Sequence, residues 1–397
     1  MKRIGIYGGT FNPPHLGHLR AAQFALEKLR LDKLLMIPSC QSPHKNLSAD
    51  DPAPEQRLAM LQIALKDQTG LEASDLELCR GGISYTYETV LAVRKLYPDC
   101  EIVLCMGSDM FLTLQNWRNP ETILSNASLA VFGRGHKEET QRIAEKKAEL
   151  TAQGATVYVL ENPVTMISST DLRRLICFGC TDAFLPEGVG AYIREHKLYG
   201  YGLDYKDLPM EQLEAVVVSL LKKNRVAHVL SCRDTSQELA RIWGANEEDA
   251  ARAGLLHDIT KALDGPLQLT LCQAYGTILS DFSRQNPKTL HALTGSMVAQ
   301  RIFGENPAVV SAIASHTTGK ADMNVLEKII YVADYMEPNR DFPGVERLRH
   351  YAVTDLDLAL KTGLEMTLAM LKEQGREVSK ESQEALSWLN KNHVPKG

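Results

Sequence analysis

Short apolar segments alternate with longer amphipathic segments through roughly the first 160 residues of the chain. The short segments are apolar, and several contain β-branched residues, which favour strands. They are Arg3–Tyr7, Lys33–Ile37, Glu101–Cys105, Leu129–Phe132 and Thr156–Leu160. The longer segments repeat apolar residues at helical spacing, in Leu16–Arg30, Pro54–Lys66, Tyr85–Tyr97 and Glu138–Gln153. This alternation predicts an α/β domain with a Rossmann-like, doubly wound parallel sheet and helices on both faces. Ligands of such sheets bind beyond the C-terminal ends of the strands.

The pattern changes near residue 200. Residues 186–199 predict a last helix of the first domain, and a Gly-containing polar stretch follows it. We therefore expect a first domain over residues 1–200, a linker over 201–208 and a second domain over 209–397. Beyond the linker the strand signals disappear, and an all-α domain is predicted. Its helices are expected at Met210–Lys222, Val226–Trp243, Glu247–Leu263, Leu290–Phe303, Pro307–His316, Val325–Met336, Asp355–Lys372 and Ser382–Asn392.

Length and charge limit the class of protein. The 397 residues are too many for one ordinary core, and 44% hydrophobic with 23% charged residues is typical of a globular protein. The net charge of -5 argues against a nucleic-acid partner. No signal peptide and no bilayer-spanning apolar run is visible, so we expect no membrane partner. The oligomeric state stays open, with a homo-oligomer as one option.

The cysteines indicate a reducing compartment. Eight are scattered through the chain without a dense framework, so a cytoplasmic location is expected. Cys177 and Cys180 have C-x-x-C spacing, but a structural metal site needs a second ligand pair, and none appears nearby. Two reduced thiols near a helix end are the better interpretation.

The first candidate site follows the first predicted strand directly. The string Gly8-Gly-Thr-Phe-Asn-Pro-Pro-His-Leu-Gly-His18 contains glycines that let the backbone approach a phosphate, and it opens a helix whose N-terminus favours anions. His15 and His18 share one helix face and can stabilise charge during phosphoryl transfer. The other candidate binding residues of the string are Gly8, Gly9, Thr10, Phe11 and Asn12. The string fits neither a P-loop nor a G-x-G-x-x-G loop, and the alternative is a turn that happens to contain two histidines.

A second segment, Ile167-Ser-Ser-Thr-Asp-Leu-Arg173, has the same kind of chemistry. Ser168 and Ser169 are good N-caps, so free amides at a helix start would meet phosphate beside Thr170, and Arg173 lies about one turn further. Alone, this string would suit any capped helix. Together, the two strings resemble the H-x-G-H nucleotidyltransferase superfamily, here as His15-Leu-Gly-His18.

Within that superfamily, residues 1–199 most resemble the bacterial nicotinate-nucleotide adenylyltransferases. The likeness covers Pro43-His44-Lys45, Ser84-Tyr-Thr86, Met106-Gly107-Ser108-Asp109-Met110, Trp117 and Phe132-Gly-Arg134. In the family, the tryptophan stacks on the pyridine ring and the arginine meets ATP. The departures are Thr10 for Ser, Asn12 for Asp and Ser108 for Ala. Taken singly, Trp117 could be ordinary packing and Lys45 an ordinary loop charge.

The resemblance implies adenylyl transfer from ATP with Mg²⁺ to nicotinate mononucleotide, giving deamido-NAD and pyrophosphate. The attacking phosphate is already an anion, so positioning and charge stabilisation carry the rate. The candidates for that role are His15, His18, Lys45, Arg134 and Arg173, while His44, Thr86, Gly107, Asp109, Trp117, Ser168, Ser169 and Thr170 are candidates for substrate binding. A superfamily member with another acceptor, such as phosphopantetheine or a cytidine nucleotide, is the alternative.

A spaced set of histidines and aspartates marks the second domain. His228, His257-Asp258, His291, His316 and Asp334 recur on successive predicted helices. These ligand types suit iron, manganese or zinc, and the set is large enough for two metal ions bridged by Asp258. A metal pair can activate water and clamp phosphate oxygens. Alternatively, histidines near helix ends are ordinary capping or surface residues, and an isolated His-Asp pair is commonplace.

The order of these residues resembles the HD-domain phosphohydrolases. More closely, residues 209–375 resemble the bacterial HD-domain diadenosine tetraphosphate hydrolases, through Ala253–Lys261, His291-Ala, His316–Gly319 and Tyr331–Arg340. This implies symmetrical cleavage to two ADP and a preference for iron.

The same resemblance implies a role for each residue. His228, His257, Asp258 and Asp334 would hold one metal. His291, His316 and the shared Asp258 would hold the other, and Lys261 and Arg340 would meet phosphates, although either could be a surface charge. A hydrolase of other nucleotides and a nucleotide-sensing regulatory module are the alternatives.

Overall fold

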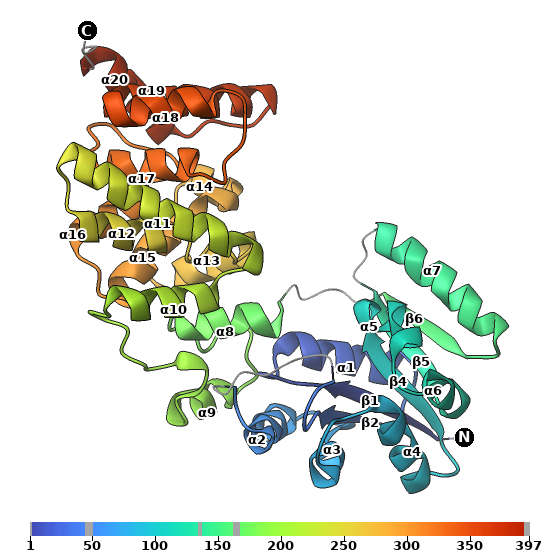
Figure 1. Cartoon of the computed structure of the whole chain (residues 1–397). Helices are drawn as coiled ribbons and strands as arrows, with labels where there is room; N and C mark the ends of the chain where they lie inside the picture. The colour runs from blue at the N-terminus through green and yellow to red at the C-terminus, as the bar shows by residue number, and fades with distance from the viewer. Residues whose placement is uncertain (1, 44–50, 134–136, 162–166, 393–397) are drawn as a thin grey trace. The chain divides into compact units, whose positions relative to one another are not determined.

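The computed structural model describes residues 2–43, 51–133, 137–161 and 167–392 (Figure 1). The chain divides into two compact units, residues 1–202 and 203–397. His44, Lys45 and Arg134 lie outside the described residues. None of the helices in the described part combines the length and the apolar character that crossing a bilayer requires.

The first unit contains a six-stranded parallel sheet in the order β3-β2-β1-β4-β5-β6. The strands are β1 (Arg3–Gly9), β2 (Lys33–Pro38), β3 (Leu71–Ala73), β4 (Glu101–Gly107), β5 (Ser128–Gly133) and β6 (Val157–Glu161). The predicted α/β fold is therefore confirmed. The strand that the prediction missed, β3, has only three residues, too few for a periodic pattern.

Both faces of this sheet are covered, each by its own apolar core. One core joins Leu34 and Met36 of the sheet to α1 (Leu16–Lys28), α2 (Pro54–Leu65), α8 (Ser169–Cys177) and α9 (Val189–Glu195). The other joins Ile4 and Ile6 to α4 (Thr86–Leu96), α6 (Pro120–Asn126) and α7 (Lys137–Ala152). The shorter elements are α3 (Leu76–Arg80), α5 (Ser108–Leu112), η1 (Leu114–Asn116) and η2 (Leu198–Gly200).

The single helix expected over residues 186–199 is wrong in its extent. The structure has α9 followed by η2, because Lys197 and Tyr199 adopt positive φ angles of 52° and 59°, which end a right-handed helix.

The topology places the switch point of the sheet at β1. Strand β1 pairs with β2 on one side and with β4 on the other, so the chain reverses its winding direction between β1 and β4. Gly9 at the end of β1 lies beside Pro38 at the end of β2. In open α/β sheets, this switch point is where ligands bind.

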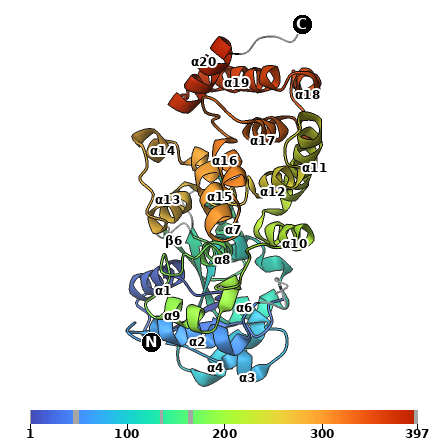
Figure 2. The same ribbon diagram turned by 90° about the vertical axis from the view of Figure 1, so that its left-hand side faces the viewer.

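The second unit is all-helical, as predicted (Figure 2). Its helices are α10 (Met210–Leu220), α11 (Lys223–Trp243), α12 (Glu247–Leu256), α13 (Gly265–Ala274), α14 (Asp281–Gln285), η3 (Pro287–Thr289), α15 (Leu290–Arg301), α16 (Pro307–Ser315), α17 (Val325–Met336), α18 (Val345–Thr354), α19 (Leu356–Glu373) and α20 (Lys380–Asn392). The prediction missed α13, α14 and α18.

A glycine lets α11 and α12 approach closely. A Cβ atom on Gly254 would lie 2.9 Å from the Cα of Arg233, so a larger residue would push the helices apart. Helix α12 ends at Leu256, seven residues before the predicted end at Leu263. Turns follow, so His257 and Asp258 lie just beyond the end of this helix.

Candidate active sites

The first histidine pair caps its own helix. The Nδ1 atom of His15 accepts from the backbone N–H of His18 at 3.4 Å, and Nδ1 of His18 accepts from that of His15 at 3.3 Å. The two rings are stacked with centroids 3.6 Å apart. Because each Nδ1 accepts, a neutral ring carries its proton on Nε2. Each Nε2–H can then donate to a phosphate oxygen.

Burial keeps one of these rings neutral. His15 is 5% exposed, and desolvation lowers its pKa to about 4. Two charged rings in a stack would repel each other, so a neutral His15 also favours the observed geometry. His15 is therefore suited to donate a hydrogen bond without taking up a proton.

The second motif lies against the first, although more than 150 residues separate them in the chain. Arg173 Nη1 donates to the carbonyl of Asn12 at 2.8 Å, and Ser169 Oγ donates to that of Pro13 at 3.3 Å. The Ser168 side chain caps α8 by accepting from Asp171 N–H. The guanidinium of Arg173 also contacts the Thr170 hydroxyl at 3.3 Å. The two motifs that were predicted to bind phosphate thus lie together.

The glycine loop leaves space in which a ligand could contact the protein backbone at Gly8. A Cβ atom on Gly8 would meet no atom within 4 Å, whereas one on Gly9 would touch the Phe11 ring at 3.4 Å. Phe11 is buried and has a φ of 45°, which turns the chain out of β1. The Asn12 Oδ1 atom accepts from the Tyr199 hydroxyl at 2.8 Å.

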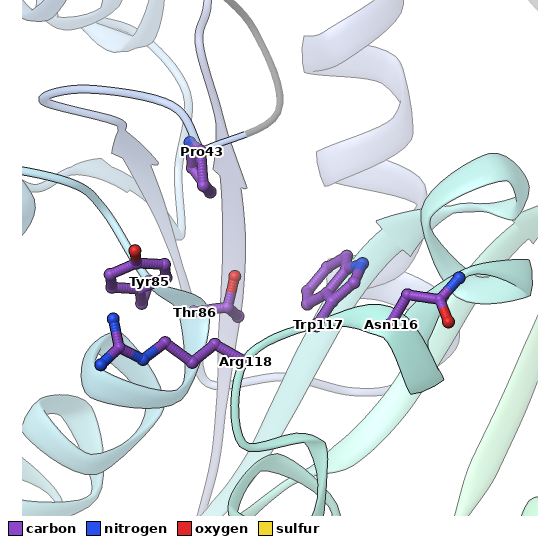
Figure 3. A pocket seen from close by; sticks show the side chains of 6 residues that line it. All are labelled: Pro43, Tyr85, Thr86, Asn116, Trp117 and Arg118. Atoms are coloured by element: carbon purple, nitrogen blue, oxygen red, sulfur yellow. The ribbon is translucent and has the colours of Figure 1, made fainter.

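Aromatic residues line a cavity of about 390 Å³ in the same unit (Figure 3). Its lining residues are Pro43, Tyr85, Thr86, Asn116, Trp117 and Arg118. The predicted binding residues Thr86 and Trp117 therefore lie together. The volume of the cavity and its mixed polar and aromatic lining suit a small ligand.

The predicted Gly107–Asp109 loop ends β4 and begins α5. Asp109 Oδ1 accepts from the N–H of Met110 at 3.0 Å. Ser108 is fully buried, and its hydroxyl donates to Glu139 Oε1 at 2.5 Å, so the departure from alanine introduces a hydroxyl that is satisfied within the protein.

The second site is organised around one carboxylate. Asp258 Oδ2 lies 3.8 Å from His228 Nε2 and 3.6 Å from His257 Nε2. Asp258 Oδ1 faces the other way, 3.5 Å from His291 Nε2 and 3.9 Å from His316 Nε2. Five of the six predicted ligands therefore converge, with one oxygen of Asp258 toward each histidine pair.

The remaining aspartate joins the first pair. Asp334 Oδ1 lies 3.1 Å from His228 Nε2 and 3.7 Å from His257 Nε2. Burial favours its neutral form, but the hydrogen bond from His228 and the nearby His257 and Arg340 hold the pKa of Asp334 well below its usual range. It is therefore ionised, as a metal-ligating carboxylate must be.

Backbone carbonyls orient three of the imidazoles. The Nδ1 atoms of His257, His291 and His316 lie 2.6–2.8 Å from the carbonyls of Gly254, Lys288 and Ile313. Each Nδ1 must therefore carry the proton, which leaves the Nε2 lone pair toward the centre. Burial holds the pKa of His257 and His291 well below the usual range and lowers that of His316 to about 4. Neutral, pre-oriented imidazoles are the form that binds metal.

Three cations surround this cluster. Lys261 Nζ lies 2.8 Å from His291 Nε2, and Arg340 Nη2 lies 2.6 Å from Asp334 Oδ1. Arg225 of α11, which sequence reasoning did not single out, contacts Asp258 Oδ2. Positive side chains next to an acidic, histidine-rich centre suit a ligand that carries several negative charges.

The ligand atoms fit divalent metal ions. Two groups of side chains each offer three ligand atoms within 4.8 Å of one another. One group is His228, His257 and Asp334, and the other is His257, Asp258 and His316. Nitrogen and carboxylate donors suit iron, manganese and zinc, so the donor set implies divalent metals without deciding between them.

Comparison with known proteins identifies the first unit. Residues 6–175 match the sequence profile of the Cytidylyltransferase-like family. A probable nicotinate-nucleotide adenylyltransferase of Symbiobacterium thermophilum is 39% identical over 211 residues, which is 52% of this chain and 100% of the relative. The N-terminal half of this chain belongs to the nicotinate-nucleotide adenylyltransferase family. A second relative, from Gemmatimonas aurantiaca, is 37% identical over 199 residues, or 50% of this chain and 92% of the relative.

The second unit contains an HD domain. Residues 225–339 match the profile of the HD domain family. A crystal structure of a predicted HD superfamily hydrolase involved in NAD metabolism, from Clostridium acetobutylicum, is 35% identical to this chain. The match covers 47% of this chain and 99% of that one, with a TM-score of 0.46.

A buried arginine of the adenylyltransferase unit was not predicted. Arg57 is 0% exposed, and its guanidinium donates to the carbonyls of Thr10 and Ser39 at 2.7 Å, Cys40 at 3.1 Å and Pro52 at 3.3 Å. It therefore ties the motif loop to the end of β2 and to the start of α2. In the sequence, Arg57 looks like any charged residue of an amphipathic helix.

Replacing Arg57 with methionine is expected to destabilise this unit by about 3 kcal/mol, because buried carbonyls would lose their donors. Its melting transition should fall by roughly 6–12 °C in scanning calorimetry. The exposed Arg142→Met on α7 is the matched control. A melting transition of Arg57→Met equal to that of the control would show that these bonds contribute little.

The HD unit also contains a carboxylate that was not predicted as part of the site. Glu337 is 1% exposed, its Oε1 lies 3.0 Å from His228 Nδ1, and its Oε2 accepts from the N–H of Asn339 at 2.7 Å. It thereby gives His228 the partner that backbone carbonyls give the other three histidines.

Glu337→Ala is therefore expected to weaken metal binding by about 10- to 100-fold, because His228 would lose its orientation. Titration of the metal-free chain with Mn²⁺ measures this. Glu346→Ala, at an 81% exposed side chain of the same unit, should bind as the wild type does. Equal affinities of the two variants would contradict an orienting role for Glu337.

Proposed function

We propose that the first unit transfers the adenylyl group of ATP to nicotinate mononucleotide, forming deamido-NAD and releasing pyrophosphate. The observation that supports this most is the meeting of the His15–His18 pair with Arg173 at one sheet edge. Membership of the nicotinate-nucleotide adenylyltransferase family supports the acceptor.

The chain's residues would act by positioning and by stabilising charge. The mononucleotide phosphate attacks the α-phosphorus of ATP in line with the departing pyrophosphate. The Nε2–H groups of His15 and His18 would donate to the phosphate oxygens that gain charge, and Arg173 would hold a further oxygen. Mg²⁺ bound with ATP would neutralise part of the polyphosphate charge. We propose Lys45 and Arg134 as further phosphate contacts and His44 as a further binding residue.

A panel of acceptors tests this function. The full chain is incubated with ATP, Mg²⁺ and nicotinate mononucleotide, and deamido-NAD and pyrophosphate are quantified. Equal amounts of the two products are expected. Transfer to phosphopantetheine or to a cytidine nucleotide, without transfer to the pyridine nucleotide, would assign another acceptor.

For the HD unit, we propose a two-metal phosphohydrolase that cleaves diadenosine tetraphosphate symmetrically to two ADP. The supporting observation is that the two oxygens of Asp258 face two different histidine pairs. His228, His257 and Asp334 would hold one metal and His291 and His316 the other, with Asp258 shared and iron as the preferred metal.

The surrounding residues would handle the substrate. A metal pair supplies an activated water and a clamp for phosphate oxygens. Lys261, Arg340 and Arg225 would bind the polyphosphate chain and offset its negative charge. Cleavage of other nucleotides instead would reassign the substrate, and nucleotide binding without cleavage would favour a sensing module.

A further inference from the structure

Asn12 of the first motif is held by hydrogen bonds at three of its atoms. The residue is 2% exposed, and both polar atoms of its side chain have partners. Its Oδ1 accepts from the Tyr199 hydroxyl at 2.8 Å, and its Nδ2 donates to Asp51 Oδ1 at 2.6 Å. Its backbone carbonyl accepts from Arg173 Nη1 at 2.8 Å. Segments that lie far apart in the sequence therefore meet on this one residue.

The orientation of the Asn12 amide follows from its two side-chain partners. A carboxylate has only acceptors, so Asp51 takes the NH₂ group of the amide, and the amide oxygen faces Tyr199. Burial holds the pKa of Tyr199 well above its ordinary value, against the opposing effect of Arg173, so its hydroxyl keeps the proton that it donates. A reversed amide would place its oxygen against the Asp51 carboxylate, which is repulsive.

Tyr199 reaches Asn12 from the end of the first unit. It lies in η2 and has a φ of 59°, which a tyrosine rarely adopts. Its ring packs against the apolar core that contains Leu172 and Ile176 of α8. Strained backbone of this kind persists where the surrounding contacts require it, and it is often found at functional sites. The packed ring and the hydrogen bond to Asn12 are contacts that support this conformation.

The placement of Asn12 bears on the site because Asn12 holds Arg173. An arginine side chain has many rotamers, and fixing one of them in advance lowers the entropy that ligand binding costs. A guanidinium has five N–H donors, so the bond from Nη1 to Asn12 leaves others for a phosphate oxygen.

We propose that Tyr199 and Asp51 are positioning residues for adenylyl transfer, which fix the Asn12 amide and, through its backbone carbonyl, the guanidinium of Arg173. This inference rests on the transfer proposed above. Neither residue would touch the reacting phosphates. A displacement of about 1 Å at a catalytic site can cost ~100-fold in rate, so a loosened Arg173 should lower kcat more than it raises KM.

The first test removes one hydroxyl from the full-length chain, assayed with ATP, Mg²⁺ and nicotinate mononucleotide. Tyr199→Phe keeps the ring and is expected to lower kcat by ~10-fold, with both KM values within about twofold of the wild type. Its melting temperature should lie within about 4 °C of the wild type, since one hydrogen bond is lost. Tyr201→Phe, which removes a hydroxyl from a ring on the same core, should leave kcat unchanged.

Double variants then show whether the effect passes through Asn12 and Arg173. Asp51→Ala alone should also lower kcat by ~10-fold, and its combination with Tyr199→Phe should lose ~10-fold rather than ~100-fold, because both changes release the same amide. Adding Tyr199→Phe to Arg173→Ala should lower kcat by less than about twofold further, because the group that Tyr199 positions is already absent.

Each other outcome overturns the proposal in a recognisable way. Unchanged kcat in Tyr199→Phe removes the positioning role. Losses that multiply in the double variants show that Tyr199 and Asp51 act independently of Arg173. A loss confined to KM, or one accompanied by a large fall in melting temperature, assigns Tyr199 to binding or to folding alone. A folded wild-type chain that forms no deamido-NAD removes the proposed transfer itself, which is distinct because no rate exists to be altered.

Discussion

Asp258→Asn is expected to abolish hydrolysis by the HD unit, with a loss of roughly 10³-fold or more. Both oxygens of Asp258 face histidine pairs, at 3.5 Å from His291 and 3.6 Å from His257. Asparagine keeps the size but loses the charge and one acceptor, so a shared metal bridge becomes unfavourable. A metal pair contributes several kcal/mol to such reactions, and each 1.4 kcal/mol is tenfold in rate.

The same preparation supplies the internal control. Adenylyl transfer by the Asp258→Asn chain should equal that of wild type, and the exposed Asp341→Asn should affect neither activity. Metal content is measured alongside the rates and should fall in Asp258→Asn alone. A folded Asp258→Asn chain that keeps its metal and its rate would rule out the bridging role.

His18→Ala is expected to lower the turnover of adenylyl transfer by about 10²- to 10³-fold, because a donor to the developing phosphate charge is lost. The free energy of unfolding should fall only modestly. His18 also accepts a hydrogen bond at the start of α1, and loss of such a cap costs about 0.5–2 kcal/mol.

Two measurements separate these effects. Rates at saturating substrate report the loss of charge stabilisation, and the melting temperature reports the loss of the cap. His196→Ala is the matched control, because His196 is exposed and stacks on Tyr192 at 3.9 Å. Unchanged turnover in a folded His18→Ala chain would remove His18 from the catalytic group.

The two folds could be predicted from the sequence because their elements are long and periodic. Strands such as Glu101–Gly107 are continuous apolar runs, and the helices around them repeat every three to four residues. Strand β3 and helix α14, with three and five residues, lack enough residues for such a pattern. Their formation depends on packing against the rest of the unit, which no local pattern records.

The residues of the candidate sites also differ in whether the sequence alone predicts them. His15, His18 and the His257-Asp258 pair stand in strings whose spacing already indicates their chemistry. Arg57 and Glu337 do not, because their roles come from carbonyls and a histidine that other segments bring to them. The burial of such a charged residue can be recognised only in the folded structure, where the surrounding segments are in place.

The most direct test of two catalytic centres in one chain is an analysis of products from diadenosine tetraphosphate. The full-length chain, loaded anaerobically with Fe²⁺ or Mn²⁺, is incubated with this substrate, and the nucleotides are separated by chromatography. We predict two ADP per substrate as the only product, a yield that persists in His18→Ala and disappears in Asp258→Asn. AMP with ATP as products, or no cleavage by a folded and metal-loaded chain, would contradict a symmetrical hydrolase.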